Sequence, residues 1–193
     1  MSKLNIVIGA VAVVALVIGL KLWHQTESPQ ASGGLNAYVL APPKDIPKFS
    51  LLDSTGKPFN NNSLWSHWTF VVFGSATHST EEMSQSLSEL NKVVHTLSSQ
   101  KQTPVPNVVF VSIDPTNDSL DALKKYTAKF NANFIGATGD PKQINLLYQE
   151  VPATKKSAFL LLDPSGKLAG IFPTPHHADF IVKDFQIIVQ NAG

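Results

Sequence analysis

The chain has 193 residues, of which 43% are hydrophobic and 15% charged, and its formal net charge is +1. This length fits one domain of ordinary size, and the weak charge excludes the strong electrostatic field that nucleic-acid binding needs, so no nucleic-acid partner is expected. The sequence has no cysteine, which excludes disulfides, thiol redox chemistry, lipid attachment through cysteine and thiolate metal sites. Sulfur chemistry is left to Met1 and Met83.

An apolar stretch near the amino terminus predicts a membrane anchor. Ile6–Leu20 is continuously apolar, and with its flanks it reaches about the 20 residues that a membrane-spanning helix needs. Lys3 suits a cytoplasmic end and Trp23 an interfacial end. A cleaved signal peptide is the alternative, but only Ala31-Ser32 offers a weak cleavage site. Residues 1–23 are therefore predicted as an N-terminal transmembrane helix, with the domain facing the periplasm or an equivalent extracytoplasmic compartment.

The segment after the anchor separates it from the folded domain. Residues 24–45 are polar and rich in small residues and proline, which predicts a linker that stiffens toward the domain. The domain is expected to span residues 46–193. It opens with the alternating pattern of Phe49–Asp53 and a glycine-containing turn before Phe59, which is typical of a small hairpin.

A strand, a short loop and a long helix follow in immediate succession. Thr69–Gly74 is a β-branched and aromatic run closed by glycine, which predicts a strand covered on both faces. Ser79 is predicted as the helix N-cap, with Glu82 completing a capping box. One apolar stripe of the helix faces a core, namely Met83, Leu87, Leu90, Val94 and Leu97. In open α/β sheets, reactive groups collect at the carboxyl ends of strands, where the loop at 75–78 lies.

The rest of the chain continues to alternate strands and helices. The pattern predicts a strand at 108–113, a helix capped by Asn117 or Asp118, a strand at 133–137, a helix begun by Asp140-Pro141, a hairpin at 159–172 and a helix at 178–190. This order predicts an α/β thioredoxin-like sandwich, in which a mixed central sheet is flanked by helices.

Several spaced motifs resemble those of the Sco/SenC family. They are Phe73-Gly74, Thr77-His78, the helix segment Leu87–Val93, Ser112-Ile113-Asp114-Pro115, Tyr126 and Gly136-Ala137-Thr138-Gly139. The resemblance extends over residues 46–190. Members of that family are thioredoxin-like, membrane-anchored proteins that assist copper delivery or thiol reduction during cytochrome c oxidase assembly. The resemblance implies the same fold and a part in the same process.

The resemblance also implies three copper-ligand positions, and all three depart from the family pattern. The family has two cysteines separated by three residues and a distal histidine, where this chain has Ser79, Met83 and Lys155. Losing both thiolates removes thiol–disulfide exchange and the soft anionic donors that select Cu(I). No cofactor is therefore expected, although copper stays possible.

A residual metal site would use His78 and Met83, because imidazole and thioether groups both bind copper. Glu81 or Glu82 lies close by in sequence. Two plainer roles compete: Met83 as a flexible core residue, and His78 as a solvated or hydrogen-bonded loop residue. Lys155 would bring a cation toward the metal position. The sequence therefore predicts no tight copper binding.

Other candidate sites are weaker. His176-His177 lies in a proline-rich turn that is expected to be solvated, and adjacent histidines do not converge easily on one ion. Ser79, His78 and Glu82 are sequence neighbours, which rarely achieve hydrolase geometry, and no nucleophile elbow is present. The chain is therefore not expected to be an enzyme.

The favoured function is a noncatalytic binding partner in respiratory oxidase assembly or copper handling. It would dock another protein, an oxidase subunit or an assembly factor, through the surface around Gly74–His78 and Val151–Ser157. Two alternatives stay open. One is a weak copper chaperone that uses His78 and Met83, and the other is an interaction or sensor domain unrelated to copper.

Overall fold

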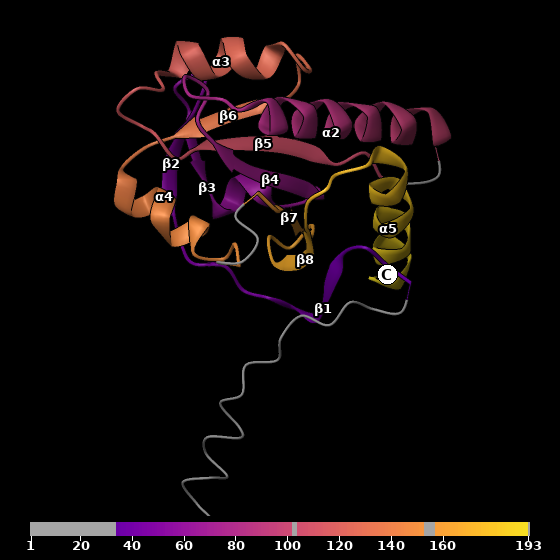
Figure 1. Cartoon of the computed structure of the whole chain (residues 1–193). Coiled ribbons are helices and arrows are strands. Elements are labelled where there is room, and N and C mark those ends of the chain that lie inside the picture. Colours follow the sequence, from indigo (N-terminus) through magenta and orange to yellow (C-terminus); the bar gives the residue numbers. More distant parts are fainter. Residues whose placement is uncertain (1–33, 102–103, 153–156, 193) are drawn as a thin grey trace, which may run out of the picture. The chain divides into compact units, whose positions relative to one another are not determined.

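The computed structural model describes residues 34–101, 104–152 and 157–192. In this part of the chain, eight strands form one mixed sheet in the order β1-β8-β7-β4-β5-β6-β2-β3. The strands are β1 Tyr38–Lys44, β2 Ser50–Asp53, β3 Pro58–Asn60, β4 Thr69–Gly74, β5 Asn107–Ser112, β6 Ile135–Thr138, β7 Phe159–Leu162 and β8 Leu168–Phe172. The helices are η1 Asn61–Leu64, α2 Glu81–Gln100, α3 Leu120–Ala128, α4 Pro141–Tyr148 and α5 Ala178–Asn191 (Figure 1).

The middle of the sheet is the parallel pair β4 and β5. Every residue of β4 is buried, as its unbroken apolar run predicts for a strand covered on both faces. Successive side chains point to opposite faces, so Phe70 and Val72 join one hydrophobic cluster and Val71 and Phe73 the other. The strand therefore contributes to two cores at once, and its carboxyl end is held firmly.

Helices cover both faces of this sheet. Leu90 of α2, Leu123 of α3 and Phe185 of α5 pack in the cluster on one face. Ile144 and Leu147 of α4 pack in the cluster on the other face. Each fully buried side chain of this size stabilises the fold by roughly 1.5–3 kcal/mol through removal of apolar area from water. The three-layer arrangement of helices, mixed sheet and helix confirms the sandwich that the order of elements predicts (Figure 1).

The first strand lies inside the segment whose composition predicts a linker. β1 pairs antiparallel with β8, with Tyr38 opposite Ile171 and Val39 opposite Gly170. It occupies the edge of the sheet. Pro42 and Pro43 suggest a stiff tether in the sequence, yet an edge strand tolerates proline because its missing N–H would face solvent. Residues 38–44 of the predicted 24–45 linker therefore belong to the sheet.

The predicted membrane anchor, residues 1–23, lies outside the described residues. Among the residues that are described, no helix is both long and apolar enough to cross a membrane.

The start of α4 agrees with the sequence pattern, since Asp140 accepts a hydrogen bond of 2.7 Å from the amide of Lys142 and Pro141 opens the helix.

Candidate functional site

The candidate site lies where β4 and β5 end side by side. Gly74 pairs with Ser112, and the amide of Ile113 donates to the Gly74 carbonyl at 2.9 Å. A Cβ atom on Gly74 would lie 3.0 Å from the ring of Phe110 and 3.1 Å from the methyl group of Met83. A side chain there would push Phe110 and Met83 outward by a few tenths of an ångström, so glycine lets both pack closely at the point where β4 turns into the loop that leads to α2.

Asp118 organises that loop. Its carboxylate is buried and accepts hydrogen bonds from the amides of Ala76 and Thr77, both at 2.8 Å, and from the hydroxyl of Ser112 at 2.6 Å. Burial raises the pKa of the Asp118 carboxyl, but the hydrogen bonds from Ser112, Thr77 and Ala76 together outweigh it and leave the pKa below its ordinary value. The charged carboxylate thus fixes the loop backbone.

The sequence pattern assigns Asn117 or Asp118 to the cap of the next helix, and this assignment is wrong. Ser119 caps α3 instead, accepting a hydrogen bond of 3.2 Å from the amide of Ala122. Asp118 does not cap the helix because its carboxylate instead accepts hydrogen bonds from two backbone amides of the loop after β4. The one signal in the sequence is position: Asp118 follows the carboxyl end of a strand parallel to β4, where polar groups of neighbouring strands meet.

His78 lies at the outer edge of the loop. Its Nδ1 atom is 3.0 Å from Oδ2 of Asp114, and 66% of its side chain is exposed. Asn117 donates to both oxygens of Asp114, at 2.9 and 3.0 Å, and so orients that carboxylate. His78 is therefore a hydrogen-bonded surface residue whose ring orientation is set by an acidic partner.

Ser79, at the first ligand position that the family resemblance implies, turns toward α3. Its Oγ lies 2.5 Å from the hydroxyl of Tyr126 and 3.4 Å from Oγ of Ser84. The prediction of Ser79 as the N-cap is wrong. Thr80 takes that role, with extended backbone angles and a hydroxyl that accepts from the amide of Met83 at 3.2 Å. Both hydroxyls suit a cap, and the nearby Tyr126 engages the one on Ser79.

Met83, at the second ligand position that the resemblance implies, is partly buried and packs against the core cluster to which α2 contributes. Its methyl group lies over Gly74 beside the Phe110 ring. His78 has a different neighbour, the surface carboxylate of Asp114. The third position, Lys155, lies outside the described residues. Within the described ranges, no group of three His, Cys, Asp or Glu side chains is arranged to hold a metal ion.

The donor set does not fit a tightly held Cu(I). Soft thiolate or thioether ligands select Cu(I), whereas the groups gathered here are mainly hydroxyl and carboxylate oxygens. The one imidazole, on His78, is bonded to Asp114, and the one thioether, on Met83, is engaged in packing. The chemistry of the cluster is that of hydrogen bonding.

His176 differs from its expected place in a solvated turn, because it is buried. Its ring stacks on Phe159 with centroids 3.5 Å apart, its Nε2 donates to the carbonyl of Phe172 at 3.1 Å, and its Nδ1 accepts from Ser86 at 2.9 Å. Burial lowers the pKa of His176 to about 4, against the opposing effect of the Phe172 carbonyl. The residue is a neutral packing group with both nitrogens engaged. His177 next to it is exposed.

Solved structures define the class of fold. The chain is similar to a thiol:disulfide interchange protein of the thioredoxin family from Chlorobium tepidum, with a TM-score of 0.58 at 19% identity over 76% of this chain and 97% of that one. It is also similar to yeast Sco1 with copper bound, with a TM-score of 0.70 at 23% identity over 77% and 94% of the two chains. BsSco, described as a member of the Sco family of cytochrome c oxidase assembly proteins, gives 0.60 at 19% over 77% and 95%. The fold is thioredoxin-like.

The family follows from the sequence. The SCO1/SenC family model matches residues 41–190. A SCO2-like protein of Rickettsia felis is 33% identical over 140 residues, which cover 72% of this chain and 68% of that protein. A putative copper-binding protein of Stutzerimonas stutzeri is 29% identical over 72% and 69% of the two chains. The chain belongs to the Sco/SenC family, and the resemblance stated from its motifs is confirmed.

Proposed function

We propose that this chain is a membrane-anchored Sco/SenC protein that acts as a noncatalytic binding partner in respiratory cytochrome oxidase assembly or copper handling. The observation that supports it most directly is the state of Ser79. This residue stands at the family's first thiol position, and its hydroxyl bonds to Tyr126 and Ser84. With no cysteine in the chain, the mixed disulfide of thiol exchange has no atom on which to form.

The arrangement around Ser79 also argues against hydrolysis. A serine nucleophile needs a general base, most often a histidine, within hydrogen-bond reach. The partners of the Ser79 hydroxyl are Tyr126, Ser84 and the carbonyl of Thr80, whereas His78 bonds to Asp114. The two groups have separate partners, so the proposal assigns no catalytic role to either.

The loop offers instead a preorganised surface for another protein. Asp118 fixes its backbone, so docking there costs little ordering entropy. Ile113, 46% exposed, and His78 stand at the same end of the sheet. An exposed apolar side chain beside a rigid polar loop is the composition of a protein-binding patch, with an apolar centre and a polar rim. The proposed partner is an oxidase subunit or an assembly factor.

Capture of the partner from detergent-solubilised membranes tests this surface. We expect Ile113→Asp in the full chain to abolish capture of the partner. Val105→Asp is the matched control, because Val105 is 42% exposed and lies before the other end of β5. Equal capture by both variants, or no oxidase subunit or assembly factor among the captured proteins, contradicts the proposal.

A weak copper chaperone is the second candidate, and one observation favours it. The Nδ1 atom of His78 is engaged by Asp114, and no described residue bonds to its Nε2 atom. Histidines that bind metals commonly have a carboxylate partner on the other ring nitrogen. Calorimetric titration with Cu(I) and Cu(II) decides between the two: the proposal expects no stoichiometric submicromolar binding. Such binding, lost in His78→Ala and kept in the exposed His67→Ala control, would establish the chaperone.

The proposed location rests on the apolar stretch Ile6–Leu20 and its flanks. We propose that residues 1–23 anchor the chain and that the domain faces the periplasm or an equivalent compartment. Added protease should then degrade the domain in intact spheroplasts. A domain left uncut there, but cut after lysis, would place it on the cytoplasmic side.

A further inference from the structure

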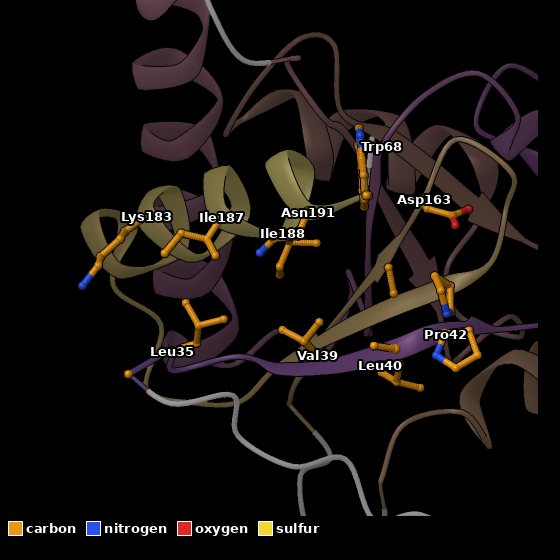
Figure 2. Close-up of a pocket in the computed structure, with 15 residues that line it drawn as sticks. Leu35, Val39, Leu40, Pro42, Trp68, Asp163, Lys183, Ile187, Ile188 and Asn191 are labelled. Carbon is orange, nitrogen blue, oxygen red and sulfur yellow. The ribbon is translucent and has the colours of Figure 1, made fainter.

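An apolar groove lies between β1 and α5, on the opposite edge of the sheet from β2 and β3. Its volume is about 850 Å³. The side chains that line it are mainly apolar, among them Leu35, Val39, Leu40, Trp68, Ile187 and Ile188 (Figure 2). Sites for small apolar ligands typically have volumes of ~300–1,000 Å³ and few polar groups, so the groove has the size and lining of a binding site.

The groove has one basic end. Figure 2 shows Lys183 and Leu35 toward one end, and Asp163 and Pro42 toward the other, with other apolar side chains between them. Lys183 is exposed, and no ion pair joins it to any residue that the structure describes. The geometry suits a long apolar ligand that carries a negative charge at one end.

The basic end lies next to the point where the chain continues toward its amino terminus. Gly34, the first described residue, itself lines the groove. Residues 24–33 contain no large apolar side chain that could fill it. Fully extended, these residues reach about 35 Å at most, so an anchor ending at residue 23 would hold the Lys183 end of the groove within that distance of the bilayer.

We propose that this groove binds an acyl chain of an anionic phospholipid from the anchoring membrane. The headgroup phosphate lies at Lys183, and the chain runs past Ile187 toward Trp68. An acyl chain that passes from the bilayer into the groove exchanges one apolar environment for another, so the preference among lipids comes from charge: one lysine near an anionic headgroup adds about fivefold. The inference rests on the membrane anchoring proposed above.

Fluorescence of Trp68 tests the proposal. The full chain with Trp23→Phe and Trp65→Phe retains Trp68 as its single tryptophan. It is reconstituted in vesicles of phosphatidylcholine and phosphatidylglycerol, in which one lipid or the other carries bromine on its acyl chain. Bromine quenches a tryptophan that it contacts. We expect brominated phosphatidylglycerol to quench Trp68 and brominated phosphatidylcholine to quench it less.

Three variants locate the effect. Ile187→Asp, which places a charge among the apolar lining, should abolish quenching. Lys183→Glu, a surface change that preserves the fold, should reduce the preference for phosphatidylglycerol about fivefold or more. Lys124→Glu is the matched control, since it reverses an exposed lysine on α3, and it should leave quenching unchanged.

Provided that the chain floats with the vesicles, either of two results overturns the proposal. One is the absence of quenching by either brominated lipid. The other is equal quenching in Ile187→Asp, Lys183→Glu and the control. Failure to float at all overturns the anchoring on which the inference rests, so the two failures are distinguishable.

Discussion

His176 is a single residue that couples the stability of the domain to pH. It is enclosed between Ser86 and the carbonyl of Phe172 and stacked on Phe159. Burial holds the pKa of His176 at about 4 in the folded protein, against 6.5 for an ordinary histidine. Between these values the unfolded chain binds a proton at this position and the folded chain does not, so acidification favours unfolding.

We therefore predict that the free energy of unfolding falls as the pH is lowered from 6.5 to 4, by up to roughly 3 kcal/mol from this residue alone. Below about pH 4 both states carry the proton, and this contribution stops changing. Denaturant unfolding at a series of pH values measures it. Hydrogen bonds lower the pKa of the Glu89 and Asp118 carboxyls in spite of burial. These two groups stabilise the fold above their ordinary pKa values of 4.5 and 3.8, and this stabilisation is lost as the pH falls below those values.

Two variants isolate the histidine. His176→Phe cannot titrate and should flatten the dependence between pH 6.5 and 4. His177→Gln removes the exposed neighbour and should preserve the dependence. A flat profile in the unchanged protein, or an unchanged slope in His176→Phe, would show that His176 does not cause the acid sensitivity.

The family's ligand types can be restored at the three positions where the resemblance implies copper ligands and this chain has other residues. We predict that Ser79→Cys, Met83→Cys and Lys155→His together create submicromolar Cu(I) binding, because two thiolates and an imidazole form a soft donor set. Calorimetric titration under reducing conditions measures it. The control combines Ser88→Cys and Lys92→Cys, which have the same spacing on an exposed face of α2 and no third ligand. Binding no tighter in the triple variant than in this pair would mean that the three positions do not converge.

At the scale of the elements, α2 depends on the residue that begins it. Thr80 accepts from the amide of Met83, and Glu81 and Glu82 place negative charge in the first turn, where the helix dipole favours it. The same helix start presents Ser79 and Met83 to the candidate site. The position of the cap therefore decides how both side chains are directed.

We predict that Thr80→Ala lowers the free energy of unfolding by about 1 kcal/mol, because one backbone amide of the first turn loses its acceptor. Chemical denaturation measures the change. Thr80→Ser retains the hydroxyl and should cost much less. If Thr80→Ala were as stable as the unchanged protein, another group would have to cap the helix.

At the scale of the whole molecule, the first strand and the last helix are joined by Asp184. This residue is fully buried on α5, and its Oδ2 accepts from the amides of Asn36 and Ala37 at 2.7 and 2.8 Å. These amides immediately precede β1, so their hydrogen bonds to Asp184 hold the edge strand against α5, the last helix of the fold. They also fix the end of the groove at which the chain leads to its predicted anchor.

We predict that Asp184→Ala destabilises the domain by about 3 kcal/mol, since the buried amide of Ala37 and the partly buried amide of Asn36 both lose their acceptor. Amide hydrogen exchange should accelerate in β1 before it does in β4. Asp179→Ala is the control, because Asp179 is exposed in the first turn of α5 and contributes at most about 1 kcal/mol through the helix dipole. Equal effects of the two variants would show that the hydrogen bonds of Asp184 do not hold β1 in place.

Sequence pattern predicts most of the fold because its signals are local. The run at Thr69–Gly74, the Asp140-Pro141 helix start and the turn after Asp163 each specify their element within a few residues. β1 is the exception. Its prolines suggest a tether, and only pairing with β8, more than a hundred residues away, makes it a strand.

The sequence by itself determined the order of the elements after β1, the family motifs and the loss of every thiol, since these depend on neighbouring residues and composition. Tertiary structure alone decided the partners of the site: Asp118 reaches the loop across 41 and 42 residues, Tyr126 reaches Ser79 across 47, and Ser86 reaches His176 across 90. Such contacts exist only after strands pair and helices pack, because bringing distant groups together needs the burial of the whole core to offset the lost chain entropy.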